Sequence, residues 1–75
     1  MAEDIPIDAL HPSQTNPRKT FDDEALDELA HNISEVGVLQ PLLVRPMDDE
    51  YEIIAGERRY RASKRAGLDS VPAIV

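Results

Sequence analysis

The strongest hydrophobic pattern in the chain predicts an amphipathic helix that begins near Asp22 and ends at Gly37. Apolar side chains recur there at helical spacing, and acidic residues occupy the opposite face. The apolar stripe consists of Leu26, Leu29, Ala30, Ile33 and Val36. Asp22 is expected as the N-cap, with Phe21 and Leu26 as a hydrophobic staple, and Thr20 is the competing N-cap. Gly37 is expected just beyond the helix in the left-handed conformation, which glycine adopts readily.

Shorter apolar segments on both sides of this helix predict strands. They are residues 5–10, 42–45, 51–55 and 71–75. The first is expected at a sheet edge, because Pro6 has no backbone N–H for a central ladder. The second and third flank a polar turn and predict a hairpin. A second helix is predicted over residues 57–66, closed by Gly67. The order β-α-β-β-α-β predicts an α+β fold, with three to four short strands packed against two helices.

Composition and charge narrow the class of protein. A chain of 75 residues forms one small domain, which buries only about 60% of its unfolded surface. The absence of cysteine excludes a disulfide framework, a thiolate nucleophile and a zinc–thiolate site. No apolar run approaches the ~18 residues of a membrane span, and the acidic start lacks the features of a secretory signal. We therefore expect a cytoplasmic protein with no membrane partner. Its net charge of −7 argues against unassisted binding to duplex DNA.

The positive charge is concentrated where the predicted second helix begins. Five of the eight basic residues lie within eight positions: Arg58, Arg59, Arg61, Lys64 and Arg65. A strand that ends at Gly56 and turns at once into a helix directs unpaired backbone N–H groups and a positive dipole at the turn, which favours an anion. Arg58 and Arg59 add guanidinium forks suited to phosphate oxygens. Cations in a first turn oppose the dipole by a few tenths of a kcal/mol each, and such broken rules indicate function. Glu57 offsets part of this cost and could pair with either arginine.

Taken alone, this motif is weak. Strand–glycine–helix junctions are widespread, so an ordinary solvated helix face explains the motif more often than a ligand site does. The later cations of the helix also fit a charged surface, or contact with the acidic first helix. Gln40 could donate to a phosphate or cap helix carbonyls. His11 and His31 are separated and have no carboxylate at ligand spacing, so no metal site is predicted.

Two stretches together are more specific. Residues 16–22 (NPRKTFD) with 40–44 (QPLLV) resemble the first conserved box of ParB-family N-terminal domains. Residues 55–62 (AGERRYRA) with 71–73 (VPA) resemble the second box, and the order and separation also match. The likeness covers about residues 5–75. It implies the ParB/sulfiredoxin-like fold, in which a small mixed sheet packs against the helices.

The resemblance also implies a ligand and the residues that hold it. ParB-like proteins bind CTP with Mg²⁺ in this domain, and binding at a centromere-like DNA site closes two subunits into a sliding clamp. The residues that would bind the triphosphate are Gly56, Glu57, Arg58, Arg59, Gly37 and Gln40. Those expected near the base and ribose are Arg18, Thr20 and Phe21. Implied partners are DNA through downstream domains, a second copy on nucleotide binding and a partition ATPase.

The 75 residues are expected to be a single domain and a fragment. The family's third nucleotide motif, a Glu-Asn-x-x-Arg helix, would follow residue 75, as would the helix-turn-helix and the dimerisation domain. CTP hydrolysis is therefore expected only in the full-length context, and the catalytic residues are unassigned. Chromosome and plasmid partition both remain open.

Two other classes of function remain open. One is a phosphotransfer enzyme or nuclease of the ParB/sulfiredoxin-like group. Sulfiredoxin chemistry itself requires a cysteine, which the chain lacks, and the predicted site contributes only one carboxylate for a nuclease metal, that of Glu57. The other is a plain protein-interaction domain whose arginines are ordinary surface residues.

Overall fold

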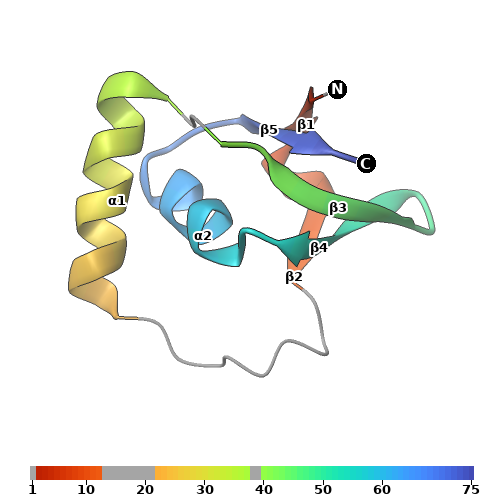
Figure 1. Ribbon diagram of the computed structural model, residues 1–75, viewed down its shortest axis with the longest axis horizontal. Helices are drawn as coiled ribbons and strands as arrows, with labels where there is room; N and C mark the ends of the chain where they lie inside the picture. The colour runs from red at the N-terminus through yellow and green to blue at the C-terminus, as the bar shows by residue number, and fades with distance from the viewer. Residues whose placement is uncertain (1, 13–21, 38–39) are drawn as a thin grey trace.

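The computed structural model describes residues 2–12, 22–37 and 40–75 (Figure 1). The elements in chain order are β1 (Glu3–Pro6), the 3-10 helix η1 (Ile7–Ala9), β2 (Leu10–Pro12), α1 (Asp23–Val36), β3 (Leu42–Met47), β4 (Glu50–Ala55), α2 (Glu57–Arg65) and β5 (Ser70–Ile74). The predicted α+β class, with two helices, is confirmed. The predicted strand number of three to four was too low, because the described residues form five strands.

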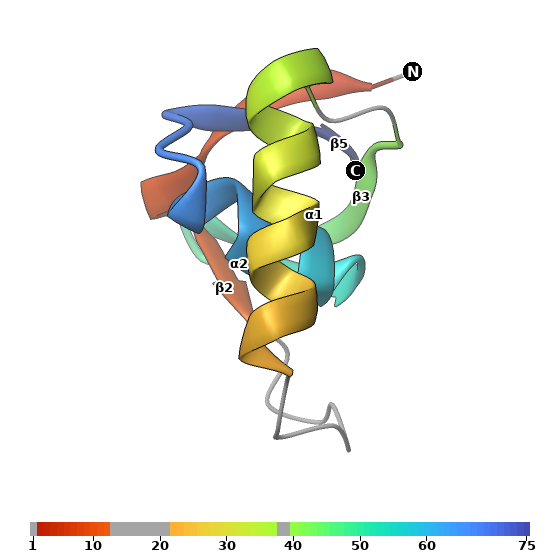
Figure 2. The same cartoon turned by 90° about the vertical axis from the view of Figure 1, so that its left-hand side faces the viewer.

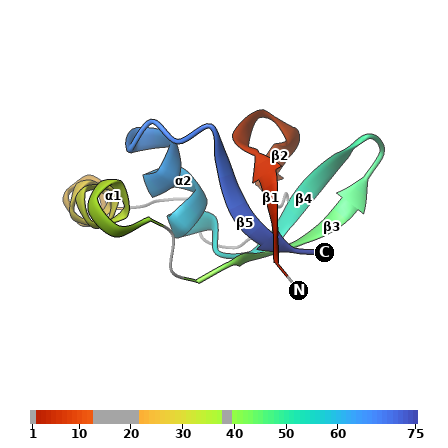
Figure 3. The same ribbon diagram turned by 90° about the horizontal axis from the view of Figure 1, so that it is seen from above.

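These strands form one mixed sheet with the order β1-β5-β3-β4-β2. β3 and β4 form the predicted antiparallel hairpin, β5 runs parallel to β3, and β2 runs parallel to β4. The first strand, β1, pairs antiparallel with β5 at one edge. Seen along two perpendicular directions, α2 lies between the sheet and α1, which forms the outer layer (Figures 1 and 3).

The missed strand comes from the first segment, residues 5–10, which was predicted as one edge strand. It is two strands, and η1 between them carries the chain from one edge of the sheet to the other. Ile5, Ile7 and Leu10 are all buried in the sheet core. A continuous strand would point Ile5 and Leu10 to opposite faces, so the 3-10 turn is what lets both side chains reach the core. Pro6 does end a strand at a sheet edge, as predicted.

Helix α1 begins as the sequence predicts. Asp22 is the N-cap, and its Oδ1 accepts a hydrogen bond from the Glu24 N–H at 3.0 Å. Three residues of the stripe, Leu26, Ala30 and Ile33, are buried. The staple residue Phe21 and the alternative cap Thr20 lie outside the described residues.

The predicted conformation at the end of α1 was half right. Gly37 has the positive φ of 81° that was expected, but its ψ of −177° is extended and not left-handed helical. Its N–H still donates to the Ile33 carbonyl at 2.8 Å, so the residue closes the last turn and then sends the chain away in an extended direction. This combination of angles is open essentially to glycine alone.

Helix α2 ends in the motif expected from Gly67. With φ of 80°, Gly67 donates to the Lys64 carbonyl and Leu68 donates to the Ser63 carbonyl, both at 3.1 Å. These two bonds form a Schellman motif, which satisfies carbonyls at the helix end. Neither helix in the described part of the chain has the length and apolar content needed to cross a membrane.

Two hydrophobic clusters hold these layers together. The larger one joins the sheet to Tyr60 of α2, and it includes the fully buried Leu42, Val71 and Ala73. The smaller one joins α1 to α2 through Leu26, Ala30, Ile33 and Ala62. Figure 2 shows α1 lying across α2 from the outer side. α2 therefore connects α1 to the sheet.

Candidate functional site

The junction between β4 and α2 is formed by Gly56. Its φ of 99° and ψ of 23° are left-handed, and a Cβ built there would lie 2.7 Å from Cδ2 of Leu42, which is fully buried. The first helical hydrogen bond runs from the Tyr60 N–H to the Gly56 carbonyl at 3.0 Å. The N–H groups of residues 57–59 therefore lack intrahelical acceptors. The helix start thus has the arrangement that the sequence predicts for an anion site.

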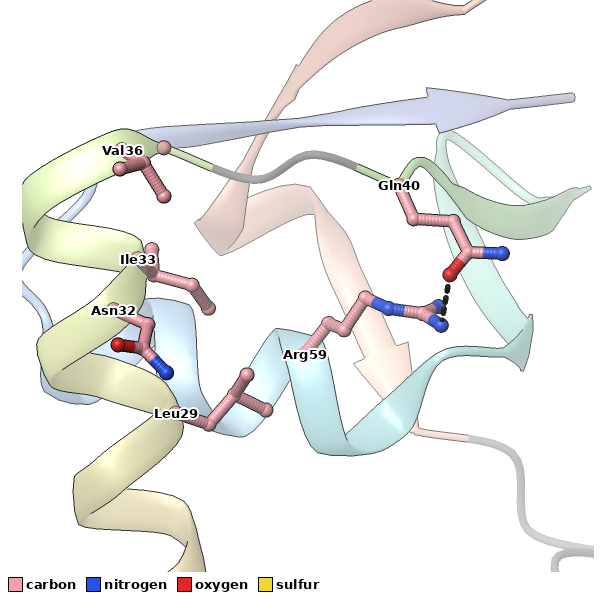
Figure 4. A pocket seen from close by; sticks show the side chains of 7 residues that line it. Leu29, Asn32, Ile33, Val36, Gln40 and Arg59 are labelled. Atoms are coloured by element: carbon pink, nitrogen blue, oxygen red, sulfur yellow. Dashed lines mark hydrogen bonds between the residues drawn. The ribbon is translucent and has the colours of Figure 1, made fainter.

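Arg59 extends from this helix start and is held by Gln40 (Figure 4). Its Nη2 donates to the Gln40 Oε1 at 2.7 Å. Its Nη1 would lie 3.2 Å from a Cβ at Gly56, so the guanidinium passes close beside the glycine. Because a neutral amide holds the guanidinium, its direction is fixed while its positive charge is left uncompensated by this contact.

Arg59 and Gln40 line a hollow of about 360 Å³ between α1 and α2, here called the Arg59 hollow. Its lining is Leu29, Asn32, Ile33, Val36, Gly37, Gln40 and Arg59. In Figure 4 the α1 side chains project toward the space that the Arg59 stem crosses. Three of the predicted phosphate contacts, Gly37, Gln40 and Arg59, therefore line the same hollow. Arg59 is 19 positions from Gln40 in the sequence.

The sequence prediction missed the wall that α1 contributes to this hollow. Leu29, Asn32 and Val36 line it together with Ile33. The apolar stripe did contain a signal, because Val36 continues it beyond the buried residues yet remains 61% exposed. Because single exposed apolar residues are common on protein surfaces, this signal was too weak to predict the wall.

The other two members of the predicted Gly-Glu-Arg-Arg site lie differently. Arg58 is exposed and is not part of the hollow's lining. Glu57 has a partner that the sequence prediction did not name: its side chain, only 9% exposed, accepts from Arg61 at 2.9 Å. The predicted base and ribose contacts Arg18, Thr20 and Phe21 lie outside the described residues.

The remaining cations of α2 contact other parts of the protein. Arg65 reaches α1 and forms ion pairs with Asp23 at 2.6 Å and Asp27 at 2.7 Å, as the acidic-helix interpretation predicted. The hydrogen bonds to Asp23 and then Asp27 raise the pKa of Arg65 above its already high ordinary value. Lys64 lies 5.5 Å from the centre of the Tyr60 ring.

The two histidines each pair with a single glutamate. His11 of β2 contacts Glu50 of β4, and His31 contacts Glu35 one turn further along α1. Nowhere in residues 2–12, 22–37 and 40–75 do three histidine, aspartate or glutamate side chains gather in a way that could hold a metal ion.

Comparison with known proteins gives the family context of this geometry. The profile of the ParB N-terminal domain matches residues 1–75. Stage 0 sporulation protein J of Bacillus subtilis is 58% identical over 73 residues, which are 97% of this chain and 26% of the relative. The chain thus spans about a quarter of the length of the curated relatives it matches.

Solved structures show the same fold. The C-terminally truncated chromosome-partitioning protein ParB from Caulobacter crescentus, complexed with CTP-γ-S, matches with a TM-score of 0.94 and 50% identity, over 100% of this chain and 43% of that one. The same protein complexed to the centromeric parS site matches with a TM-score of 0.91 and 51% identity, over 97% and 39%.

A structure with lower sequence identity also has this fold. Sulfiredoxin from Arabidopsis thaliana superposes with a TM-score of 0.82 at 24% identity, over 99% of this chain and 82% of its own, which is a likeness of fold alone. The ParB/sulfiredoxin-like architecture that the two sequence boxes implied is confirmed. The chain belongs to the ParB N-terminal domain family.

Proposed function

We propose that this domain binds CTP, with the triphosphate at the start of α2, and acts as the nucleotide-responsive switch of a chromosome-partitioning protein. The observation that carries the proposal is the position of Arg59, held by Gln40 beside Gly56 and within the Arg59 hollow. The CTP-γ-S complex of the Caulobacter protein, which covers all of this chain, supports the choice of nucleotide.

Each phosphate-binding residue has a distinct part in this proposal. Gly56 lets an oxygen approach the backbone, because it has no side chain and stands at the positive end of the α2 dipole. Arg59 supplies a charge-assisted hydrogen bond from a fixed direction. Arg58, which is exposed, reaches the ligand from the solvent side. Gln40 contributes its side-chain amide N–H beside Arg59, and Gly37 lets the ligand approach the backbone where the hollow meets the end of α1.

The Glu57 side chain is better suited to stabilising the first turn of α2 than to contacting the triphosphate. A carboxylate beside a triphosphate repels it, and this carboxylate is paired with Arg61 and nearly buried. We therefore assign to Glu57 a role in anchoring the first turn of α2, beside the phosphates. Arg18, Thr20 and Phe21 remain predicted neighbours of the base and ribose on the strength of the family resemblance.

Magnesium enters this proposal only together with the nucleotide. Mg²⁺ commonly binds through substrate phosphates and water, with few protein ligands. Since the described residues form no cluster of three acidic or histidine side chains, we assign no residue of this chain as its ligand.

The role of the whole protein is proposed from its relatives. They are chromosome-partitioning proteins, and the Caulobacter ParB also forms a complex with parS DNA. We propose that CTP binding here controls self-association of two copies on DNA, that DNA contact is made by other domains, and that a partition ATPase is a partner. Any hydrolysis of CTP belongs to the full-length protein.

The test is a titration of the purified protein with CTP and with ATP in the presence of Mg²⁺, by calorimetry and by amide chemical shifts. CTP is expected to bind more tightly and to shift Gly56 and Gly37 most. Arg59→Ala should weaken CTP binding by about tenfold or more, since a hydrogen bond to a charged group contributes roughly 1.5–3 kcal/mol.

The matched control is Lys64→Ala. It removes one positive charge from the same helix, but Lys64 lies over the Tyr60 ring and is not part of the Arg59 hollow. We expect its CTP affinity to stay close to that of the unchanged protein. Equal losses in the two variants would mean that only net charge matters, and the proposed site would then be wrong.

A further inference from the structure

Helix α1 is attached to the rest of the fold mainly through α2. The cluster that joins them, Leu26, Ala30, Ile33 and Ala62, is separate from the sheet core and contains two alanines. Small side chains at a helix contact allow close approach and provide few interlocking ridges to fix how one helix sits along the other. The cluster has only four buried residues, so contacts outside it also contribute to the position of α1.

The two ends of this helix pair carry different chemistry. At one end, Gly37 after α1 and Arg59 of α2 border the Arg59 hollow. At the other end, Arg65 of α2 bonds to the first turns of α1 (Asp23 and Asp27). The pair is therefore antiparallel. Gly37 lies ten residues beyond Asp27, about 15 Å along the axis of α1 at 1.5 Å per residue, whereas Leu29 of the hollow lies within one turn of Asp27.

The contact made by Arg65 fixes more than a single distance. Nη2 donates to Asp23 Oδ1 at 2.6 Å, and Nη1 donates to Asp27 Oδ1 at 2.7 Å and to the Asp23 carbonyl oxygen at 3.3 Å. A planar guanidinium bonded to two carboxylates one helical turn apart restrains both the rotation of α1 and its movement along its axis. Isolated exposed ion pairs usually contribute little, but several charges joined in a network, as here, are an exception.

We propose that Arg65 is a positioning residue for the nucleotide site: by holding the start of α1 on α2, it sets where the α1 wall and Gly37 stand relative to Arg59. The inference rests on the proposed function for the identity of the ligand. A rigid helix transmits a shift at one end to the other. Loss of the Arg65 contacts with Asp23 and Asp27 therefore displaces Gly37, although Arg65 does not contact Gly37.

The key experiment compares two neighbouring cations. Arg65→Met and Lys64→Met each remove one positive charge from the same turn of α2, so their long-range effects on an anionic ligand are matched. CTP affinity is measured by calorimetry with Mg²⁺, well below the melting temperature of each variant, so that all are folded. We expect Arg65→Met to weaken CTP binding about three- to tenfold and Lys64→Met to leave it nearly unchanged.

Removing the carboxylates that pair with Arg65 distinguishes positioning from electrostatics, because the two explanations predict opposite changes in CTP affinity. The double variant Asp23→Ala/Asp27→Ala removes the side-chain acceptors of Arg65 and makes the protein less negative, so a purely electrostatic effect would tighten CTP binding. If Arg65 acts by positioning α1, this variant weakens binding as Arg65→Met does. The matched control Glu24→Ala/Glu28→Ala changes the charge of α1 equally and leaves both partners of Arg65 intact. Tighter or unchanged binding in the aspartate variant, or equal weakening in both double variants, would overturn the proposal.

A nucleotide-free measurement separates this inference from the proposed function. The amide signals of Gly37 and Arg59 are expected to shift more in Arg65→Met than in Lys64→Met, although Gly37 lies at the far end of α1. If the unchanged protein fails to bind CTP while these signals move, the proposed ligand is wrong and the coupling stands. If the signals are the same in both variants, Arg65 does not position this site.

Discussion

Replacing Gly56 by alanine should destabilise the domain more than the same replacement at Gly67. Two separate terms contribute. The residue has φ of 99°, where a side chain is strained, and the added Cβ would lie 2.7 Å from Cδ2 of Leu42. Leu42 has no exposed surface and belongs to the sheet core, so it has no open space to move into.

The magnitude follows from these two terms. An L-residue in the left-handed region costs about 1–2 kcal/mol, and forcing extra volume into a packed core costs about 1–3 kcal/mol. Allowing for partial relaxation, we expect Gly56→Ala to lower the free energy of unfolding by about 2–4 kcal/mol. For a domain of this size that corresponds to a melting temperature roughly 10–25 °C lower.

Gly67→Ala is the matched control for the strain term. Gly67 has φ of 80°, and nothing lies within 4 Å of a Cβ built there. This variant should therefore lose only about 1–2 kcal/mol, from strain alone. Urea unfolding followed by far-UV circular dichroism measures both variants, and the difference between them isolates the contact with Leu42. Equal losses would refute the argument that Leu42 leaves no room beside Gly56.

Two further predictions concern single hydrogen-bonding groups, measured by the same unfolding assay. Asp22→Ala should lower the free energy of unfolding by about 1 kcal/mol, because it removes the acceptor for the Glu24 N–H at the start of α1. The exposed Glu28→Ala on the same helix should change little, and equal effects would contradict the capping role. Ser63→Ala should stabilise the protein by up to about 1 kcal/mol, because the fully buried Ser63 hydroxyl has no hydrogen-bond partner among the described residues. A loss of stability would show that the hydroxyl is bonded.

The features that could be predicted from the sequence depend on neighbours within one turn. Asp22 caps α1 because its carboxylate accepts a hydrogen bond from an N–H only two residues away. Gly67 ends α2 because the chain needs a positive φ there. The hairpin of β3 and β4 is equally local. Such interactions form between residues that are close in every conformation of the chain, so sequence spacing determines them.

The features that could not be predicted depend on partners far apart in the sequence. The alternation over residues 5–10 is the same whether the segment forms one strand or turns through η1 to the opposite edge. What decides between them is pairing with β5 on one side and β4 on the other. Likewise, Gln40 holds Arg59 across 19 positions and Arg65 holds Asp23 across 42, distances over which periodicity carries no information.

The chemistry of each partner distinguishes the arginines of α2, which the sequence presents as equivalent. Arg61 and Arg65 are bonded to carboxylates, so a phosphate would have to displace an anion to use either charge. Arg59 is held instead by the neutral amide of Gln40, and within the described residues it forms no ion pair. A neutral partner fixes the direction of the guanidinium without neutralising its charge, which is the preorganisation that strong anion binding requires. Gln40→Glu, which keeps the size of the side chain and adds a carboxylate, should therefore weaken CTP binding more than Gln40→Ala, which only frees Arg59.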